Sequence, residues 1–116
     1  MKVVYIAGPY SAPNAWKREQ NIRSAEGVCV ALWSEGVAAV CVHSTSRYFH
    51  GAVSEANAIA IDDAILMRCD AIMLVDGWQD SPGSLREIRI ADATGKRVFF
   101  PSQYAECVAW AKGPDA

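Results

Sequence analysis

Residues 76–87 carry the clearest chemical signal in the chain, because they join a turn to the start of a helix that contains a carboxylate. Ser81 followed by Pro82 is typical of a helix N-cap with proline at the first helical position, where its missing N–H costs nothing. The helix then opens toward the loop with free backbone amides, and Glu87 falls near its second turn. Glu87 is therefore within reach of whatever these amides hold. The spacing Ser84-x-x-Glu87 also matches a capping box, which would give Glu87 a local structural role.

Asp62 is a second candidate for acid–base chemistry. It follows Ile61 and precedes Ile65 by three residues, so it borders the apolar stripe of a helix rather than lying opposite it. Partial burial there would raise the pKa of the carboxyl group and suit it to proton donation. The alternative is that Asp62, like Asp63, only solvates the outer face of the helix.

A first loop, residues 8–14, leaves a short apolar run and enters a long helical segment. Gly8 permits a tight backbone approach, Tyr10 is an aromatic tip, Ser11 offers a hydroxyl and Asn14 is a possible helix N-cap. These residues could contact a ligand, although any turn between a strand and a helix needs something similar.

A second loop, residues 43–54, mixes aromatic side chains with hydrogen-bonding ones. Such a mixture suits the stacking of a flat base while His43 or Arg47 meets an anion. The alternative for this loop is a lid or an oligomer contact, and the two interpretations are compatible.

The elements that must position these loops follow from apolar periodicity. Short β-rich runs predict strands at residues 3–7, 37–42, 71–75 and 97–100. Apolar residues three and four apart predict helices between them, the first ending at Gly36 and the third at Gly95, with a last short helix over residues 102–111.

This alternation, with strands that are apolar on both faces, predicts an α/β fold: a flavodoxin-like or Rossmann-like three-layer sandwich around a parallel sheet of about four or five strands. Ligands bind such sheets at the carboxyl ends of the strands, where the three loops should meet.

The composition limits the partners of the protein. A chain of 116 residues fits one domain, which we assign to residues 1–111 with 112–116 as a flexible tail. A net charge of −2 gives no basic field for a nucleic acid polymer. The sequence has neither a signal peptide nor an apolar run of about 18 residues, so we expect no membrane partner and a cytoplasmic protein.

Motifs for cofactors and metals are missing from the sequence. The first loop is not G-x-G-x-x-G, and Gly95-Lys96 lacks the other residues of a phosphate-binding P-loop. The cysteines at positions 29, 41, 69 and 107 form no C-x-x-C pair, which favours buried reduced thiols over disulfides or a zinc site. We expect no metal and no organic cofactor.

Taken in order, the motifs resemble those of the nucleoside 2-deoxyribosyltransferase superfamily, in particular its small phage and bacterial members. The resemblance covers nearly the whole chain. The matching pieces are Tyr5-Ile-Ala-Gly-Pro-Tyr10, Asp62 eight residues before Asp70, Val75-Asp-Gly77, Ser81-Pro-Gly-Ser-Leu-Arg-Glu87 and Gly95-Lys96.

The resemblance implies cleavage or exchange of the N-glycosidic bond of (deoxy)nucleosides or their 5′-monophosphates. Glu87 would attack the anomeric carbon as in a retaining glycosidase, and Asp62 would assist at the leaving base or sugar. Ser81 stands where nucleotide hydrolases of the family bind a 5′-phosphate. The candidate substrate-binding residues are Gly8, Tyr10, Ser11, His43, Arg47, Asp76, Ser81 and Gly83.

Arg86 and Arg89 depart from the family pattern, since relatives often carry an aromatic residue and a glycine there. These cations could strengthen phosphate binding, or could pair with Glu87 and silence it. A catalytically silent nucleotide-binding or sensing module of the same fold is therefore the alternative function. Four tryptophans in so short a chain, and the family's habit of completing its sites across a dimer, predict a homodimer or a higher homo-oligomer.

Overall fold

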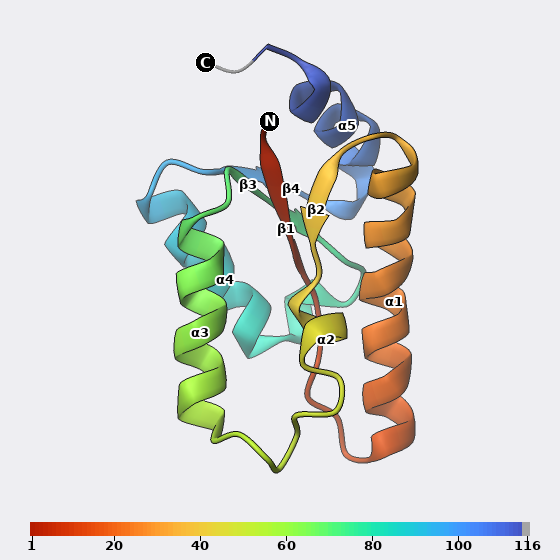
Figure 1. Cartoon of the computed structure of the whole chain (residues 1–116), viewed down its shortest axis with the longest axis vertical. Coiled ribbons are helices and arrows are strands. Elements are labelled where there is room, and N and C mark those ends of the chain that lie inside the picture. The colour runs from red at the N-terminus through yellow and green to blue at the C-terminus, as the bar shows by residue number, and fades with distance from the viewer. Residues whose placement is uncertain (115–116) are drawn as a thin grey trace.

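A four-stranded parallel sheet lies between helices in the computed structural model, which describes residues 1–114 (Figure 1). The strands are β1 (Val3–Ala7), β2 (Ala38–Val40), β3 (Ala71–Leu74) and β4 (Arg97–Phe99). They lie in the order β2-β1-β3-β4, and each neighbouring pair is parallel. This arrangement confirms the predicted α/β sandwich, and the order matches the flavodoxin-like type.

Five helices and two short 3-10 turns connect and cover the strands in the described part of the chain. The helices are α1 (Ala15–Ser34), α2 (Val42–Thr45), α3 (Glu55–Met67), α4 (Pro82–Ala93) and α5 (Tyr104–Lys112), and the turns are η1 (Trp78–Asp80) and η2 (Pro101–Gln103). The predicted strand at residues 3–7 coincides with β1, whereas the other predicted strands extend beyond the observed ones by one to three residues.

Local capping sets the ends of the long helices. The side chains of Asn14 and Ser81 accept hydrogen bonds from the third residue beyond each of them, which confirms both as N-caps. Gly36 and Gly95 follow α1 and α4 with φ of 79° and 72°, a left-handed conformation that favours glycine. The predicted ends of the first and third helices are thus confirmed.

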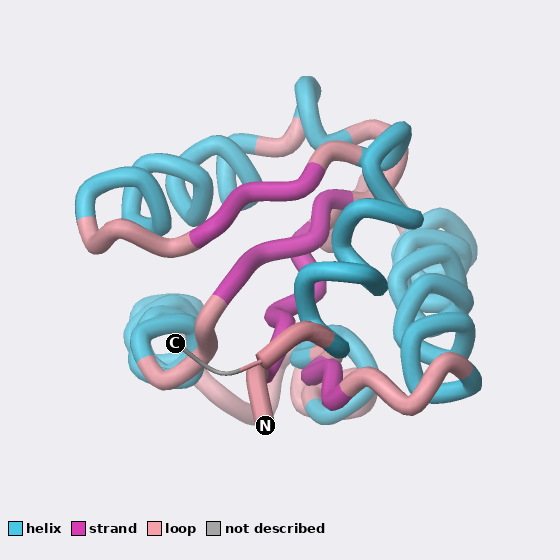
Figure 2. The backbone as a smooth tube through the Cα atoms, turned by 90° about the horizontal axis from the view of Figure 1, so that it is seen from above, coloured by secondary structure: helices cyan, strands magenta, loops and turns pink. Residues whose placement is uncertain are grey.

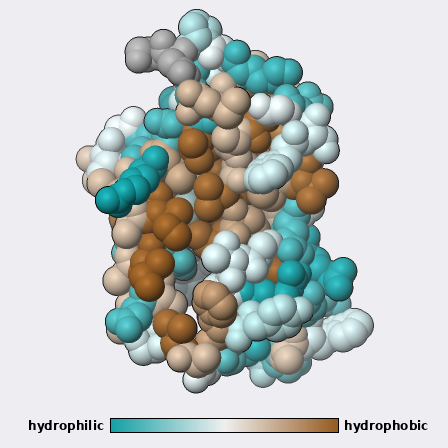
Figure 3. Space-filling model, viewed as in Figure 1, coloured by the Kyte–Doolittle hydropathy of each residue, from teal (hydrophilic) through white to brown (hydrophobic). Residues whose placement is uncertain are grey.

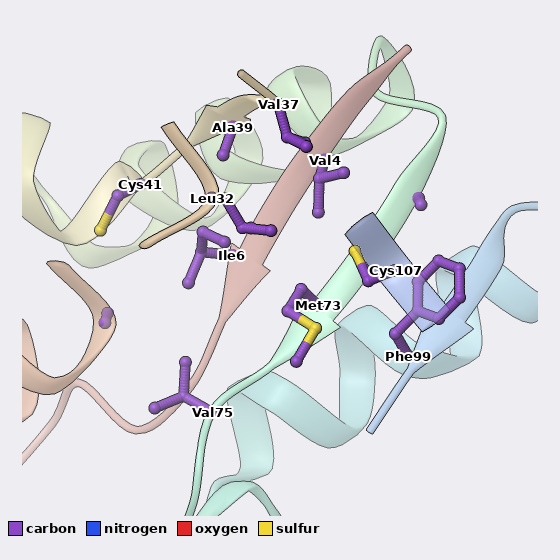
Figure 4. Close-up of a cluster of buried hydrophobic side chains, with 12 residues drawn as sticks. Val4, Ile6, Leu32, Val37, Ala39, Cys41, Met73, Val75, Phe99 and Cys107 are labelled. Atoms are coloured by element: carbon purple, nitrogen blue, oxygen red, sulfur yellow. The ribbon is translucent and has the colours of Figure 1, made fainter. Parts of the chain in front are cut away.

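Alternate residues of β1 face opposite layers, and this separates two hydrophobic cores. Val4 and Ile6 pack with residues of α1 and α5, including Leu32 and Cys107 (Figure 4). Tyr5 faces the other way, into the core formed with α3 and α4. The view from above shows helices on both sides of the strands (Figure 2). Tyr5 is therefore the one polar side chain that β1 sends into the α3 and α4 layer.

Two expectations about the chain need correction. The second loop begins with a helical turn, α2, so the irregular segment is residues 46–54 rather than 43–54. The predicted tail begins too early, because Lys112 ends α5 and the Lys2 Nζ donates to the carbonyl oxygens of Gly113 and Pro114 at 3.2 and 2.9 Å. Residues 115–116 of that tail lie outside the described part.

The structure also describes the state of the cysteines and the length and apolar character of the helices. All four cysteines are free thiols; Cys41, Cys69 and Cys107 are buried as predicted, whereas Cys29 is only partly buried. Within residues 1–114, no helix has the length and apolar character needed to cross a membrane.

Candidate active site

The three predicted loops follow the carboxyl ends of three adjacent parallel strands, β2, β1 and β3, at one edge of the sheet. Helix α4 begins at this edge, and Glu87 in this helix is buried against β1, where it contacts Tyr5. Helix α3 packs beside α4 in the same layer (Figure 1) and carries Asp62 and Asp63. The site is therefore assembled from β1, α3, α4 and the loops that precede the helices.

Glu87 is bonded to the sheet rather than to the start of its own helix. Its carboxyl group is buried, with 8% of the residue exposed, and Oε2 accepts a hydrogen bond of 2.5 Å from the Tyr5 hydroxyl. Within residues 1–114, Oε1 accepts no hydrogen bond. The capping-box alternative is therefore wrong, because Ser81 caps α4 and Glu87 instead bonds to a residue 82 positions away.

The surroundings of Glu87 disfavour its ionised form. Burial is the main cause that raises the pKa of this carboxyl group, and the negative charges of Asp62 and Asp63 add to it. The hydrogen bond from Tyr5 and the positive charge of Arg86 act in the opposite direction, and the resulting pKa is about 7. Glu87 can therefore gain or lose its proton near neutral pH, which is a property of functional carboxylates.

Asp62 lies near enough to Glu87 for its negative charge to raise the pKa of the Glu87 carboxyl group. Its residue is half-buried, and burial, followed by the charge of Asp63, raises the pKa of the Asp62 carboxyl group, while Arg86 opposes the shift. Asp62 is therefore not a fully solvated residue on the outer face of α3, which was the alternative interpretation. Of the three carboxyl groups here, those of Glu87 and Asp62 have a raised pKa, and Tyr5 holds that of Glu87.

Arg86 does not form an ion pair with Glu87. Its Nη2 donates to Asp63 Oδ1 at 2.6 Å, with the two side chains about equally half-buried. The Nε of Arg86 is buried and has no hydrogen-bond partner among the described residues. Arg86 thus spans from α4 to α3, and Asp63 holds it there.

The N-terminus of α4 forms the third part of the site. Ser81 and Ser84 are both buried, and the Ser84 hydroxyl and backbone N–H donate to the Ser81 Oγ at 3.0 and 3.2 Å. Because the Ser81 oxygen accepts twice, its own hydroxyl hydrogen stays available to donate. A Cβ added to Gly83 would meet only the Ser81 Oγ, at 4.0 Å, so the first turn is open. An exposed helix N-terminus of this kind suits an anion.

The side chains of His43 and Asn21 hold the first loop through hydrogen bonds to its backbone carbonyl groups. The Nε2 of His43 contacts the carbonyl oxygens of Gly8 and Pro9 at 3.1 Å each, so this nitrogen carries the hydrogen. The Asn21 side chain donates to the carbonyl of Tyr10 at 3.2 Å, and the Tyr10 ring meets the His43 ring edge-on. A Cβ on Gly8 would lie 2.8 Å from the Cβ of Val75, so glycine is required where the ends of β1 and β3 approach.

The structure gives His43 and Arg47 roles that differ from the predicted anion contacts. His43 is buried, and burial lowers its pKa, which favours the neutral ring; its Nδ1 has no partner among the described residues. Arg47 donates through Nη1 and Nη2 to Glu26 and through Nε to Glu19, at 2.5 to 3.1 Å. Its guanidinium is engaged by two carboxylates of α1, which leaves no free edge for a phosphate.

Ser11 and Asp76 are exposed at the same edge of the sheet, and no described contact fixes their roles. Reasoning from the sequence missed Tyr5 as a site residue. A signal was present, because Tyr5 is the one polar side chain in the strand Val-Val-Tyr-Ile-Ala, and a buried tyrosine hydroxyl needs a partner.

Metal-binding groups are not gathered here: within residues 1–114, no three His, Cys, Asp or Glu side chains lie close enough to hold an ion. The predicted lack of a metal or organic cofactor stays a prediction.

Comparison with known proteins places this site in a described family. A family model whose description reads "domain of unknown function (DUF4406)" matches residues 2–100. The match spans all four strands and helices α1 to α4, and so includes Tyr5, Asp62 and Glu87. No curated protein matches the chain.

Proposed function

We propose that this chain, which belongs to the DUF4406 family, breaks or exchanges the N-glycosidic bond of (deoxy)nucleosides or their 5′-monophosphates. The observation that carries the proposal is the state of Glu87: buried, held through one oxygen by Tyr5, and close enough to Asp62 for the two charges to interact. The resemblance of the sequence motifs to the nucleoside 2-deoxyribosyltransferase superfamily supports the same chemistry.

Glu87 acts as the nucleophile in this proposal. The Tyr5 hydroxyl fixes Oε2, so Oε1 is the oxygen that bonds to C1′ of the sugar. As this bond forms, the bond between C1′ and the base nitrogen breaks, and its electron pair leaves with the base. The product is a glycosyl ester on Glu87, reached through a transition state with oxocarbenium character.

Asp62 supplies the proton that the departing base needs. Because two neighbouring carboxylates repel each other, the pair retains one proton over part of the pH range, and the reaction uses the state with that proton on Asp62. In the second step the Asp62 carboxylate accepts a proton from water, which attacks C1′ and releases Glu87. When a second base attacks instead, the result is transfer.

The N-terminus of α4 is the favoured place for a 5′-phosphate. The Gly83 backbone N–H and the Ser81 hydroxyl are donors that no described contact uses, whereas the backbone N–H groups of Ser84 and Leu85 donate to Ser81. The guanidinium groups of Arg47 and Arg86 are engaged by carboxylates, so we assign the phosphate to the N-terminus of the helix rather than to either of these two cations.

We further propose that the active form is a homodimer or higher homo-oligomer. Helix α3 exposes Ile59, Ile61 and Met67 at 39, 55 and 48%, and apolar side chains gather over this helix in the space-filling view (Figure 3). Ile61 directly precedes Asp62, so a second copy bound here would close the open flank of the site.

Sedimentation tests this assembly. Wild type should sediment as a dimer or larger species, and Ile61→Glu should shift it toward the monomer, whereas Val30→Glu on α1 should not. A monomeric wild type at the concentrations used for activity would contradict this part of the proposal.

The free thiols of the four cysteines support a reducing compartment, and we propose that the protein is cytoplasmic.

The function is tested by incubating the protein with a panel of nucleosides and 5′-monophosphates and separating free base by chromatography. We expect base release by wild type, none by Glu87→Gln, and an unchanged rate for Glu106→Gln, which alters an exposed glutamate on α5. Binding without release by wild type would favour the silent sensing module. Normal turnover by Glu87→Gln would contradict the role of Glu87.

A further inference from the structure

Four charged residues on α3 and α4 form a cluster with unequal numbers of acids and bases. Asp62 and Asp63 are adjacent on α3, and Arg86 and Glu87 are adjacent on α4. Three carboxyl groups therefore share one guanidinium, and the partner that the guanidinium takes decides which carboxyl groups remain for a substrate.

The geometry gives the guanidinium to Asp63. Arg86 Nη2 lies 2.6 Å from Asp63 Oδ1, while the neighbouring Glu87 accepts a hydrogen bond of 2.5 Å from the Tyr5 hydroxyl. The side chains of Arg86 and Asp63 are partly buried, at 31 and 33% exposed, and their contact is a charge-assisted hydrogen bond. Arg86 and Glu87 thus have separate partners although they are chain neighbours.

We propose that Asp63 is a positioning residue that holds Arg86 away from Glu87, and so prevents the nucleophile from being silenced by an ion pair. This inference rests on the proposed function, since it assigns Glu87 as the nucleophile. A carboxylate bound by a guanidinium has its lone pairs engaged and is a weaker nucleophile. The arginine next to Glu87 therefore needs a dedicated partner.

The electrostatic balance around Glu87 supports this role. The groups that face it are Tyr5 from β1, Asp62 and Asp63 from α3, and Arg86 from α4. Arg86 lowers the pKa of Glu87 and Asp63 raises it, and the same two residues act with the same signs on Asp62. As a pair, Asp63 and Arg86 therefore act with opposite signs on both carboxyl groups.

The test is a titration of the side-chain carboxyl carbons of Glu87 and Asp62 by ¹³C NMR in the full-length chain. Asp63→Asn removes one anion and frees Arg86, and both changes favour ionisation of Glu87. Its titration midpoint should fall by about one pH unit or more. Arg86→Gln should raise the midpoints of both carboxyl groups. The double variant Asp63→Asn with Arg86→Gln should return both midpoints toward the wild-type values.

The double variant separates positioning from a merely structural bridge. All three variants lack the bridge between α3 and α4. If the bridge were only structural, the double variant would keep the shifted midpoints of a single variant, and that result would overturn the proposal. Unshifted midpoints in Asp63→Asn would overturn it as well. Asp92→Asn, which removes an exposed carboxylate of α4, is the control and should leave both midpoints unchanged.

The titration needs no turnover, so its result is distinct from that of the base-release assay. If wild type releases base, Asp63→Asn should lower the rate and the double variant should recover at least part of it. A double variant as slow as Asp63→Asn would contradict the proposal even when the base-release function stands.

Discussion

Two arginines, Arg47 and Arg86, join helices near the carboxyl edge of the sheet, but their clusters differ in the balance of charge. Arg47 follows α2 and reaches the α1 carboxylates Glu19 and Glu26 through three of its nitrogens. Arg86 reaches one carboxylate, Asp63, while Asp62 and Glu87 remain beside it without a cation of their own.

The two clusters shift their carboxyl groups in opposite directions. The hydrogen bond from Arg47 is the main cause that lowers the pKa of Glu26, which keeps this group ionised. Burial raises the pKa of Asp62, and it raises that of Glu87 to about 7, so Glu87 can exchange its proton near neutral pH. A paired carboxylate stabilises a fold, whereas a buried carboxyl group without a cation costs stability and can move a proton. The comparison supports a structural role for the first cluster and the chemical role that we propose for the second.

The largest expected effect comes from Asp62→Asn, which removes the proposed proton donor. The rate of base release should fall by roughly 10²–10⁴-fold. The pH profile should also lose its fall at high pH, because that fall reports the loss of the last proton from the Glu87 and Asp62 pair, while a rise that follows ionisation of Glu87 should remain.

Asp92→Asn is the matched control for Asp62→Asn, since it removes an exposed carboxylate from the same side of the sheet. If the rate of base release by Asp62→Asn stays within a factor of a few of the wild-type rate, Asp62 is not the acid. The chemical role of the second cluster would then rest on Glu87 alone.

The next effect is on stability, and Glu87→Gln should show it as a change in pH dependence. The pKa of Glu87 is raised from 4.5 to about 7 on folding, so the folded state binds more protons between these values and wild-type stability falls as the pH rises through them. Glu87→Gln removes this loss and should be more stable than wild type at pH 8 by on the order of 3 kcal/mol.

Urea unfolding at pH 4 and pH 8 measures the difference. Wild type and Glu87→Gln should differ less at pH 4, where the folded carboxyl group is protonated. Equal stability of the two proteins at pH 8 would mean that Glu87 is not held in its uncharged form by burial.

The smallest effect is expected at the structural cluster. Arg47→Gln breaks the contacts to Glu19 and Glu26, so the thermal midpoint of unfolding should fall. The ratio of the KM values for a 5′-monophosphate and its nucleoside should stay the same. A KM that rises for the monophosphate alone would return Arg47 to the phosphate-binding role predicted from the sequence.

The fold could be predicted because its signals are local. Apolar strands such as residues 3–7, the N-caps Asn14 and Ser81, and the helix ends at Gly36 and Gly95 are each encoded within a few residues. The helical turn α2 was missed since it is one turn long and has no side-chain cap.

The site could be predicted only in part, because its partners are distant in the chain. The local sequence favours Ser81 as the N-cap of α4, which leaves Glu87 free for a contact elsewhere. The contacts of Glu87 with Tyr5 and of Arg47 with Glu19 and Glu26 join residues 82, 28 and 21 positions apart. Nothing in the spacing of these residues says that Arg47 meets carboxylates of α1 rather than a phosphate.

The most direct test of the central claim is the mass of the protein during turnover. After rapid mixing with a 2′-deoxynucleoside or its 5′-monophosphate and quenching in acid, wild type should carry an added mass of one deoxyribosyl group or its phosphate. Peptide mapping should locate that mass on Glu87, and Glu87→Gln should carry none. Base release by wild type with no adduct, with inversion at C1′, or with the added mass on another residue would contradict the account.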